Sequence, residues 1–455
     1  MFHHKHDEKK MKKFLNISLL ALVALSALTL GSCKNEVDQI FDEDAVARLS
    51  KAQAEFTEIL TSNGGKWQLE YFANSKEPGY IYLMTFDKNG SVTISGKNKW
   101  LGGLDGGTQG SVAYGSATSL WEVITDNGPV LSLNTYNKYF HIFAEPEDIP
   151  SMSEEDPDET GYGHEGDYEF DLMKYSNDTL YITGKKYGLN MIMTRVPSTV
   201  DDRVYMDEVV AMADSFFHAK IPYVYINLPN GTRWIVKNGA TSILKMFREG
   251  DDEISTSEEH NVIITHDGLS FMEPLTLDGY TIRDFIRQAD GSLLCRNDNQ
   301  TTMTADHLST IFLMNTLRWR YDAEGMGGVF ADYITQFAAE LTAYNKSKFV
   351  FAQIDNIEGS RYEIIFNVKR SATTFKPTYY MTIDAINDHQ VKFTFESEGN
   401  AAGELYRQRC PSLGNIIEAL GSMTFDISAG SLLAPVNLKF TDVSNSSNYL
   451  YANIM

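Results

Sequence analysis

The chain has 455 residues and carries 39 Lys and Arg against 61 Asp and Glu, which gives a formal net charge of −22. This acidity argues against binding to nucleic acid or to an anionic lipid surface, because both partners require a basic face. The length suggests two or three domains. The three cysteines show no CxxC or paired Cys/His spacing, which argues against a disulfide scaffold and against a structural zinc site.

The N-terminus has the pattern of a bacterial export signal. A short basic region precedes an almost entirely apolar stretch over residues 14–30. The stretch ends in Leu30-Gly31-Ser32-Cys33, which resembles the lipobox of bacterial lipoproteins. In proteins with that signal the cysteine becomes lipid-modified, and acyl chains bind a membrane with about 0.8 kcal/mol per buried methylene. We therefore expect residues 1–32 to comprise upstream residues and a signal peptide, Cys33 to carry the lipid, and residues 33–42 to form a tether.

A helix followed by strands is expected over residues 43–200. Apolar residues recur at spacings of three and four from Ala45 to Leu60, as in an amphipathic helix, and Asn63-Gly64-Gly65 ends the pattern. The period then changes to two, beginning with Trp67-Gln68-Leu69-Glu70, and short strand candidates follow between turn clusters. Many short strands at even spacing favour an antiparallel barrel or sandwich over a parallel sheet. We interpret residues 43–200 as an N-terminal helix plus an antiparallel β domain.

Residues 201–455 continue this order of elements. A second helix is expected through 204–218 and a third near 328–344, each followed by strand candidates. We predict one or two C-terminal β-rich domains, with a possible split near 300–327. The fold class is mainly β with a few helices (α+β), in antiparallel meander or barrel-like domains that are each preceded by an amphipathic helix. No residue-level repeat is evident among the three segments.

Several of these segments together resemble a family of Bacteroidetes putative lipoproteins that is catalogued as a domain of unknown function, number 4302. The resemblance covers the lipobox and nearly the whole chain after it. It rests on the order of pieces that are individually unspecific, namely Trp67–Phe72, Gly79–Phe86, Gly128–Asn137, Gly166–Phe170, Thr183–Lys186 and Leu269–Pro274. Proteins that look like this commonly accompany outer-membrane nutrient importers of the SusC/SusD-like type. The resemblance implies the same location and context here, and it supplies no catalytic residues.

The acidic segment 145–171 is the candidate metal site. It places oxygen ligands at positions 1, 3 and 5 of a loop, then a glycine, and a carboxylate at position 12, where a calcium loop has its bidentate Glu. A proline at position 2, Asp in place of Glu and the lack of flanking amphipathic helices weaken the match. A solvated acidic loop is the alternative, and no other cofactor is expected. The candidate calcium ligands are Asp156, Asp158, Thr160 and Asp167.

No residue is assigned to catalysis. Acid pairs such as Glu165 with Asp167, or Asp251 with Asp252, have the groups that carboxylate-dependent hydrolysis needs, but sequence cannot show whether two carboxylates face each other. Among 61 acidic residues some pair always suggests itself. The chain contains neither HExxH nor a Walker A sequence.

Four aromatic residues and two cysteines allow two interpretations each. Inward aromatic residues of alternating strands usually build the core, although some could line a barrel mouth and stack on a ligand. The aromatic residues are Trp67, Tyr71, Tyr82 and Trp121. Cys295 and Cys410 could form a disulfide or remain half-buried free thiols.

The leading hypothesis is a non-enzymatic, outer-membrane-anchored and surface-exposed lipoprotein that serves as a binding accessory in nutrient uptake. Its expected partners are the membrane, through the lipid, an outer-membrane importer complex, and a small ligand, glycan or peptide. One alternative is a carboxylate-dependent hydrolase acting on glycans or peptides. Another is a purely structural component of an importer complex. The sequence determines neither the ligand, nor the oligomeric state, nor whether the protein faces the periplasm or the exterior.

Overall fold

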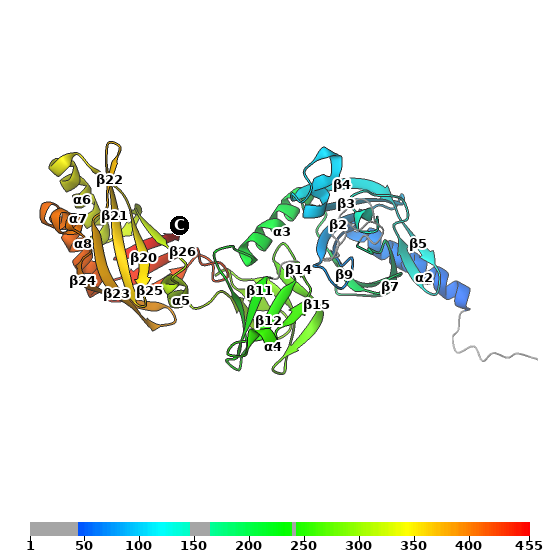
Figure 1. Ribbon diagram of the computed structural model, residues 1–455. Helices are drawn as coiled ribbons and strands as arrows, with labels where there is room; N and C mark the ends of the chain where they lie inside the picture. Colours follow the sequence, from blue (N-terminus) through cyan, green and yellow to red (C-terminus); the bar gives the residue numbers. More distant parts are fainter. Residues whose placement is uncertain (1–43, 146–163, 239–242) are drawn as a thin grey trace, which may run out of the picture.

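The computed structural model describes residues 44–145, 164–238 and 243–455. Within these residues, three antiparallel sheets of nine strands follow one another along the chain, with helices before and between them. The predicted mainly-β fold with a few helices and barrel-like sheets is therefore confirmed. Figure 1 shows the first and third sheets at opposite ends of the molecule and the second sheet between them.

The first sheet follows helix α2 (Ala45–Thr61), which begins where the Asp44 side chain accepts a hydrogen bond from the Ala47 N–H at 2.7 Å. The strand order is β4-β3-β2-β1-β9-β8-β7-β6-β5, so the first strand of the meander pairs with the last. The strands are β1 (Lys66–Tyr71), β2 (Tyr80–Phe86), β3 (Ser91–Asn98), β4 (Ala113–Leu120), β5 (Glu122–Thr125), β6 (Pro129–Ser132), β7 (Glu169–Ser176), β8 (Thr179–Gly184) and β9 (Asn190–Arg195).

The second sheet follows helix α3 (Asp202–Phe216) and has the same order shifted by nine strands, β13-β12-β11-β10-β18-β17-β16-β15-β14. The short helix α4 (Glu253–Thr256) lies between β12 and β13. The strands are β10 (Val224–Asn227), β11 (Arg233–Asn238), β12 (Leu244–Arg248), β13 (Glu258–His260), β14 (Val262–Ile264), β15 (Gly268–Leu277), β16 (Tyr280–Arg287), β17 (Leu293–Cys295) and β18 (Thr302–Thr304).

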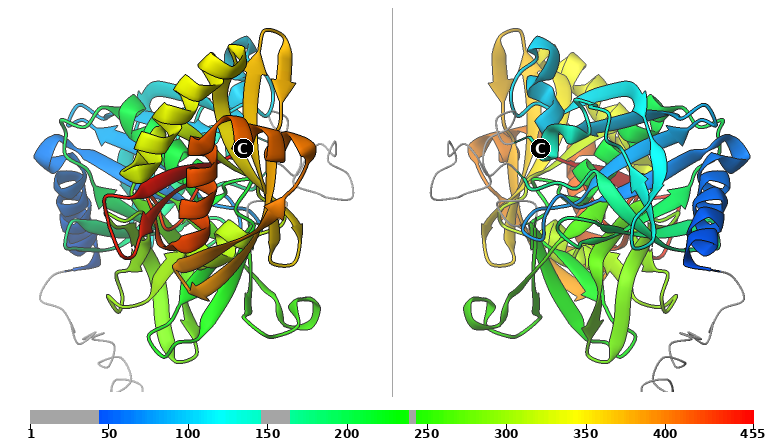
Figure 2. Two further views of the ribbon diagram at one scale, coloured as in Figure 1. Left: turned by 90° about the vertical axis from the view of Figure 1, so that its left-hand side faces the viewer. Right: turned by 90° about the vertical axis from the view of Figure 1, so that its right-hand side faces the viewer.

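The third sheet closes into a barrel, because β19 pairs with β27 and β20 pairs with β21. Its helices are α5 (Leu308–Leu313), α6 (Val329–Asn345), α7 (Ala401–Arg409) and α8 (Pro411–Ser422). Helices α6 and α8 pack together (Figure 2), and their buried residues belong to the same core as those of the strands. The strands are β19 (Trp319–Gly327), β20 (Lys348–Glu358), β21 (Arg361–Arg370), β22 (Thr373–Phe375), β23 (Thr378–Asn387), β24 (Gln390–Glu398), β25 (Thr424–Ala429), β26 (Asn437–Asp442) and β27 (Tyr449–Ile454).

The third unit differs from the expected order in one respect. The helix expected near 328–344 is present as α6, but the strand β19 precedes it. The sequence pattern missed β19 because its second half, Ala323-Glu324-Gly325-Met326-Gly327, has no alternation of apolar and polar residues.

In the first two sheets one strand is broken near its middle. A single residue, Trp121, separates β4 from β5, and a single residue, Asn261, separates β13 from β14. The two halves pair with different neighbours, since β4 pairs with β3 whereas β5 pairs with β6. Each of these sheets therefore curls until its two edge strands are joined by one residue.

The first and third units each contain the same side-chain contact, made by equivalent tryptophans. Trp67 in β1 and Trp319 in β19 stand near the start of the first strand of their unit, and both are almost fully buried. Each indole N–H donates to the carbonyl oxygen seven residues earlier, that of Leu60 or Phe312, at 2.9 Å. The repetition therefore lies in how a helix end meets the first strand, which no sequence pattern displayed.

Arg195, the last residue of β9, holds helix α2 against the pair of strands that closes the first sheet. It is the register partner of Trp67, and its guanidinium lies 4.1 Å from the centre of the Trp67 ring. Its terminal nitrogens donate to the carbonyl oxygens of Ser62 at 2.8 Å and Ile59 at 2.9 Å. Carbonyls at a helix end lack partners within the helix, so this arginine satisfies them.

Each sheet surrounds its own hydrophobic core. Cys295 and Cys410 are buried as free thiols in the second and third cores, so they form no disulfide with each other. The prediction that four aromatic residues build the core is confirmed for Trp67, Tyr71, Tyr82 and Trp121, which are 0% to 6% exposed and belong to the first core. No helix among the described residues is both long enough and apolar enough to cross a membrane.

Helix α3 joins the first unit to the second. Asp202 at its start forms an ion pair with Lys66 of β1 at 2.5 Å and accepts a hydrogen bond from the Ser95 hydroxyl at 2.7 Å. Ile263 of β14 belongs to the first core, although it lies in the second sheet. The two units therefore share buried apolar and polar contacts.

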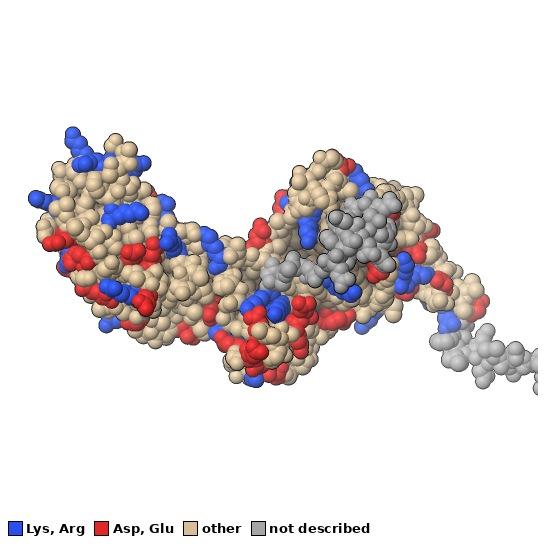
Figure 3. All heavy atoms as spheres, viewed as in Figure 1, with Lys and Arg blue, Asp and Glu red and all other residues tan. Residues whose placement is uncertain are grey.

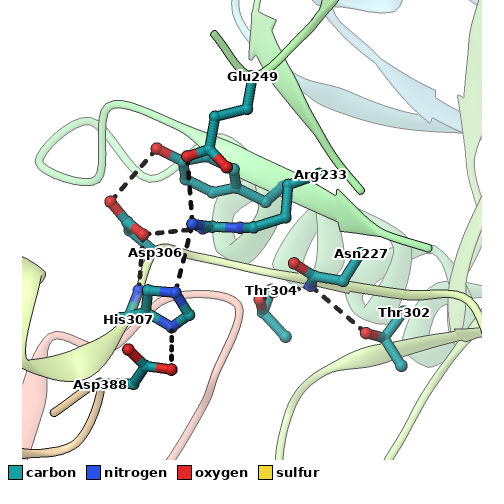
Figure 4. A network of polar contacts seen from close by, with 9 residues as sticks. Asn227, Arg233, Glu249, Thr302, Thr304, Asp306, His307 and Asp388 are labelled. Carbon is teal, nitrogen blue, oxygen red and sulfur yellow. Dashed lines mark hydrogen bonds and ion pairs between the residues drawn. The ribbon is translucent and has the colours of Figure 1, made fainter. Parts of the chain in front are cut away.

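A polar network joins the second unit to the third (Figure 4). Arg233 of β11 lies between the carboxylates of Glu249, at 3.2 Å, and Asp306, at 2.8 Å. His307 lies 3.3 Å from an Arg233 nitrogen on one side and 3.6 Å from Asp388 of the β23–β24 turn on the other. Because each charged group here already has a protein partner, we interpret the network as a connection between the units.

We expect Arg195→Met to destabilise the first unit by about 2–4 kcal/mol, because it removes charge-assisted hydrogen bonds and a cation–π contact. The Arg195 side chain is 10% exposed, so water replaces these contacts poorly. Hydrogen exchange resolved by segment should become faster in α2 and β1 and stay unchanged between β19 and β27. Arg287→Met, at an exposed arginine, is the control. Equal effects of the two variants would contradict the role given to Arg195.

Candidate functional site

A cleft of about 1220 Å³ lies between the first and second units. The outer face of β1, β8 and β9 forms one wall, β15, β16 and the turn before β15 form the opposite wall, and α3 closes one side. Clefts between domains with polar groups at defined positions are the usual binding sites for small molecules, and this one also has room for a short polymer.

The wall from the first unit is mostly neutral. Alternate residues of a strand point to the same face, so the outward residues of β8 and β9 form a surface of hydroxyl and amide groups. Thr183 donates a hydrogen bond to the Asn190 side chain at 3.1 Å, and Gln68 of β1 donates to Thr194 at 3.5 Å. Tyr181 stands in the same surface and is 43% exposed, so one aromatic ring is available to a ligand.

The wall from the second unit is charged, and its arginines are paired. Arg283 of β16 lies 3.1 Å from a Glu70 oxygen across the cleft and 2.5 Å from Asp284 beside it. Arg296 lies 3.4 Å from Asp267. The Arg283–Glu70 pair connects the two walls, because Glu70 belongs to β1 of the first unit.

Glu70 is the most perturbed acid of the cleft. Its residue is 4% exposed, and burial raises the pKa of its carboxyl to about 7, since the lowering by Arg283 is partly cancelled by Asp284. Burial lowers the pKa of Arg283, but Glu70 and Asp284 more than offset this, so its pKa is raised. Arg283 therefore stays charged while Glu70 exchanges its proton near neutral pH. An acid of this kind in a cleft is a candidate functional group.

Helix α3 contributes Tyr205 between the two walls. Its hydroxyl donates a hydrogen bond to the Gln68 side chain on one wall. Its ring lies 4.3 Å from the ring of His266, which belongs to the turn before β15 on the other wall. Burial raises the pKa of Tyr205, so this hydroxyl remains a hydrogen-bond donor across the neutral range. The helix thus sets the distance between the walls.

Of the four predicted calcium ligands, only Asp167 is among the residues that the structure describes. Asp156, Asp158 and Thr160 lie outside the described residues, as does Cys33, the predicted lipidation residue. Asp167 is buried, and its two oxygens accept hydrogen bonds from the backbone N–H groups of Lys186, at 2.9 Å, and Tyr187, at 3.0 Å. In the part of the chain that the structure describes, no group of three His, Cys, Asp or Glu side chains is placed to hold a metal. The calcium site stays a prediction.

The acid pairs suggested by the sequence do not line the cleft. Asp252 caps helix α4, where its carboxylate accepts hydrogen bonds from the backbone N–H and hydroxyl of Ser255. Glu70 and Arg283, which do meet in the cleft, are 213 positions apart. The sequence around Glu70 shows only that this residue faces outward on an alternating strand. It does not reveal that Arg283 is its partner.

Comparison with known proteins identifies a family. A family model described as "Domain of unknown function (DUF4302)" matches residues 37–289. This segment includes every residue that lines the cleft except Arg296. No curated protein matches the chain.

Solved structures show only remote likeness. The β subunit of the DNA polymerase of Streptococcus pyogenes is 11% identical, with 89% of this chain and 98% of that chain covered and a TM-score of 0.13. A DNA polymerase III sliding clamp from Bartonella birtlesii is 9% identical, with 89% and 97% covered and a TM-score of 0.13. A lipopolysaccharide binding protein is 8% identical, with 90% and 96% covered and a TM-score of 0.12. At these TM-scores none of the three supports an argument about this protein.

The raised pKa of Glu70 predicts a pH dependence of stability. Folding raises this pKa from 4.5 to about 7, so the folded protein holds the proton more tightly than the unfolded chain does. The resulting stabilisation, about 3 kcal/mol, is fully present below pH 4.5 and is lost as the pH rises to 7. Glu70→Gln lacks this contribution, so urea unfolding should show wild type losing stability relative to the variant across that interval. Glu273→Gln, at an exposed acid of the same cleft, is the control. Parallel stability curves for wild type and Glu70→Gln would refute the assignment.

Proposed function

The chain belongs to the DUF4302 family, and from that premise we propose that it is an outer-membrane-anchored, surface-exposed lipoprotein that binds a ligand in the cleft between its first two units. We further propose that it acts as a non-enzymatic accessory of a SusC/SusD-like nutrient uptake system. The lipobox ending in Cys33 and the family context support the location and the partner.

The cleft is the observation that carries the binding function. It is large, it lies between two units, and its two walls differ in chemistry, with hydroxyl and amide groups on one side and paired charges on the other. A neutral polar ligand can hydrogen-bond to both walls without leaving a buried charge unpaired. Tyr181 adds an exposed ring on which a flat apolar face can stack. These features fit a glycan or a short peptide better than an apolar or a strongly charged molecule.

Glu70 and Asp284 are the observation that favours a second candidate, a carboxylate-dependent hydrolase. Both acids contact Arg283, and the pKa of Glu70 near 7 would let it hold a proton for a leaving group at neutral pH. The buried pairing of Glu70 with Arg283 gives it an equally direct role in holding the two units together. We therefore place binding first and hydrolysis second.

Lipid anchoring at Cys33 can be tested by fractionation. We expect Cys33→Ala to lose incorporation of a labelled fatty acid and to leave the membrane fraction, because no thiol remains to be acylated. Ser32→Ala keeps a small residue before the cysteine and should behave as wild type. Continued membrane association of Cys33→Ala would show that another segment or partner holds the protein there.

The binding function can be tested with a panel of neutral oligosaccharides and short peptides in a thermal shift assay. A ligand at a hundredfold excess over its Kd stabilises the folded state by about 2.7 kcal/mol, so a true ligand raises the melting temperature measurably. Tyr181→Ala should raise the Kd roughly fivefold, because the variant loses an aromatic contact of about 1 kcal/mol. Tyr187→Ala, at a tyrosine of similar exposure that does not line the cleft, is the matched control.

The same assay distinguishes the two candidate functions. Equal weakening by both tyrosine variants would place the ligand outside the cleft. Cleavage of a bound compound by wild type, lost in Glu70→Gln, would favour the hydrolase over the binding protein.

A further inference from the structure

One end of the third barrel carries a cluster of basic side chains, which we name the basic end. Figure 3 shows Lys and Arg gathered there, over the region where Figure 1 places α6, α7 and β22. This is the end of the molecule opposite helix α2 and away from the cleft. The basic end comprises six exposed residues, Lys346, Lys348, Lys369, Arg370, Lys376 and Arg409.

Strand register brings two of these lysines face to face. Lys348 of β20 is the direct cross-strand partner of Lys369 of β21. Like charges in this position destabilise a strand pair, so folding alone does not favour this arrangement. Arg370 follows Lys369 at the end of β21. Strands β21 and β22 form a hairpin that projects beyond the body of the barrel (Figure 2).

Aromatic rings connect Arg370 with Arg409. The Arg370 guanidinium lies 5.4 Å from the Phe375 ring, and the Arg409 guanidinium lies 5.9 Å from the Tyr344 ring. Both rings contact Tyr406, with centroids 6.2 Å and 6.0 Å away respectively. Tyr406 is buried, whereas Tyr344 is 40% exposed. The two arginines are therefore linked through three rings, of which Tyr344 is the most exposed.

Three acids on neighbouring elements are engaged in other contacts. Arg407 forms ion pairs with Glu398, at 2.8 Å, and Glu418, at 2.9 Å. Glu340 accepts hydrogen bonds from Ser412. None of the six basic residues forms an ion pair with a carboxylate in the described part of the chain. A protein with 61 acidic residues thus leaves six cations at one end outside any ion pair, although Lys376 is within electrostatic reach of Glu363.

We propose that the basic end binds an anionic polysaccharide, at a site separate from the ligand cleft. The six cations provide the charge complement, and the exposed face of Tyr344 provides a surface on which one sugar ring stacks. The acidic remainder of the molecule does not prevent this, because charges more than about 8 Å apart are largely screened at physiological ionic strength.

Two other polyanions fit the surface less well. Single-stranded nucleic acid is bound through several successive aromatic platforms, and this surface exposes one ring well. A lipid surface is usually entered by large apolar side chains, whereas the tip of the β21–β22 hairpin consists of Ser371 and Ala372.

The test measures anisotropy of fluorescein-labelled heparin, a sulfated polysaccharide, with the full chain at increasing salt. Lys369→Gln with Arg370→Gln should weaken binding about tenfold or more and reduce the dependence of Kd on salt. The matched control is Arg287→Gln with Lys392→Gln, which removes one exposed arginine and one exposed lysine elsewhere. Each double variant loses two positive charges, so the two variants have equal net charge. Unchanged melting temperatures verify that both are folded.

The outcomes separate the possible sources of negative charge. Loss of binding in the first variant alone, together with a further loss in Tyr344→Ala, supports the proposal. Equal loss in both double variants, or no heparin binding at low salt, overturns it. Tighter binding to single-stranded DNA or to anionic phospholipid vesicles than to heparin and polygalacturonate also overturns it.

Discussion

The pairing of the first strand with the last is the constraint on which the rest of this structure depends. In each unit the two strands are far apart in sequence, yet β1 pairs with β9, β10 with β18 and β19 with β27. This pairing bends a meander into a curled or closed sheet whose interior is filled by side chains. In the first unit Arg195 reinforces it by binding both the Trp67 ring and the end of α2.

The cleft follows from that curvature. Once alternate residues of β1, β8 and β9 fill the first core, the residues between them must face outward, and the second unit covers part of that outward face. The covered part is where Glu70 becomes buried and acquires Arg283 as its partner. A structural contact between two units and a site able to bind a ligand are therefore built from the same residues, so ligand binding and the stability of this junction are expected to be linked.

Net charge describes this molecule poorly, because its charges are unevenly distributed. The total of −22 argues against any polyanionic partner. Yet the register of β20 against β21 places Lys348 opposite Lys369, and the nearby acids Glu398 and Glu340 are used in other contacts. With screening over about 8 Å, a partner at that end meets the local charge and not the total.

The sequence by itself determined the mainly-β fold class, the helix α2, the strand that begins at Trp67 and the burial of Trp67, Tyr71, Tyr82 and Trp121. These features depend on apolar periodicity over a few residues, which reflects the local repeat of the backbone. It could not reveal β19, whose second half lacks alternation, nor the meeting of Glu70 with Arg283, nor the facing of Lys348 and Lys369. The pairing of Glu70 with Arg283 depends on how two units dock, and the pairing of the lysines on the register of two strands. Only the tertiary structure decided these contacts, because local periodicity specifies which face a side chain occupies but not which distant residue it meets.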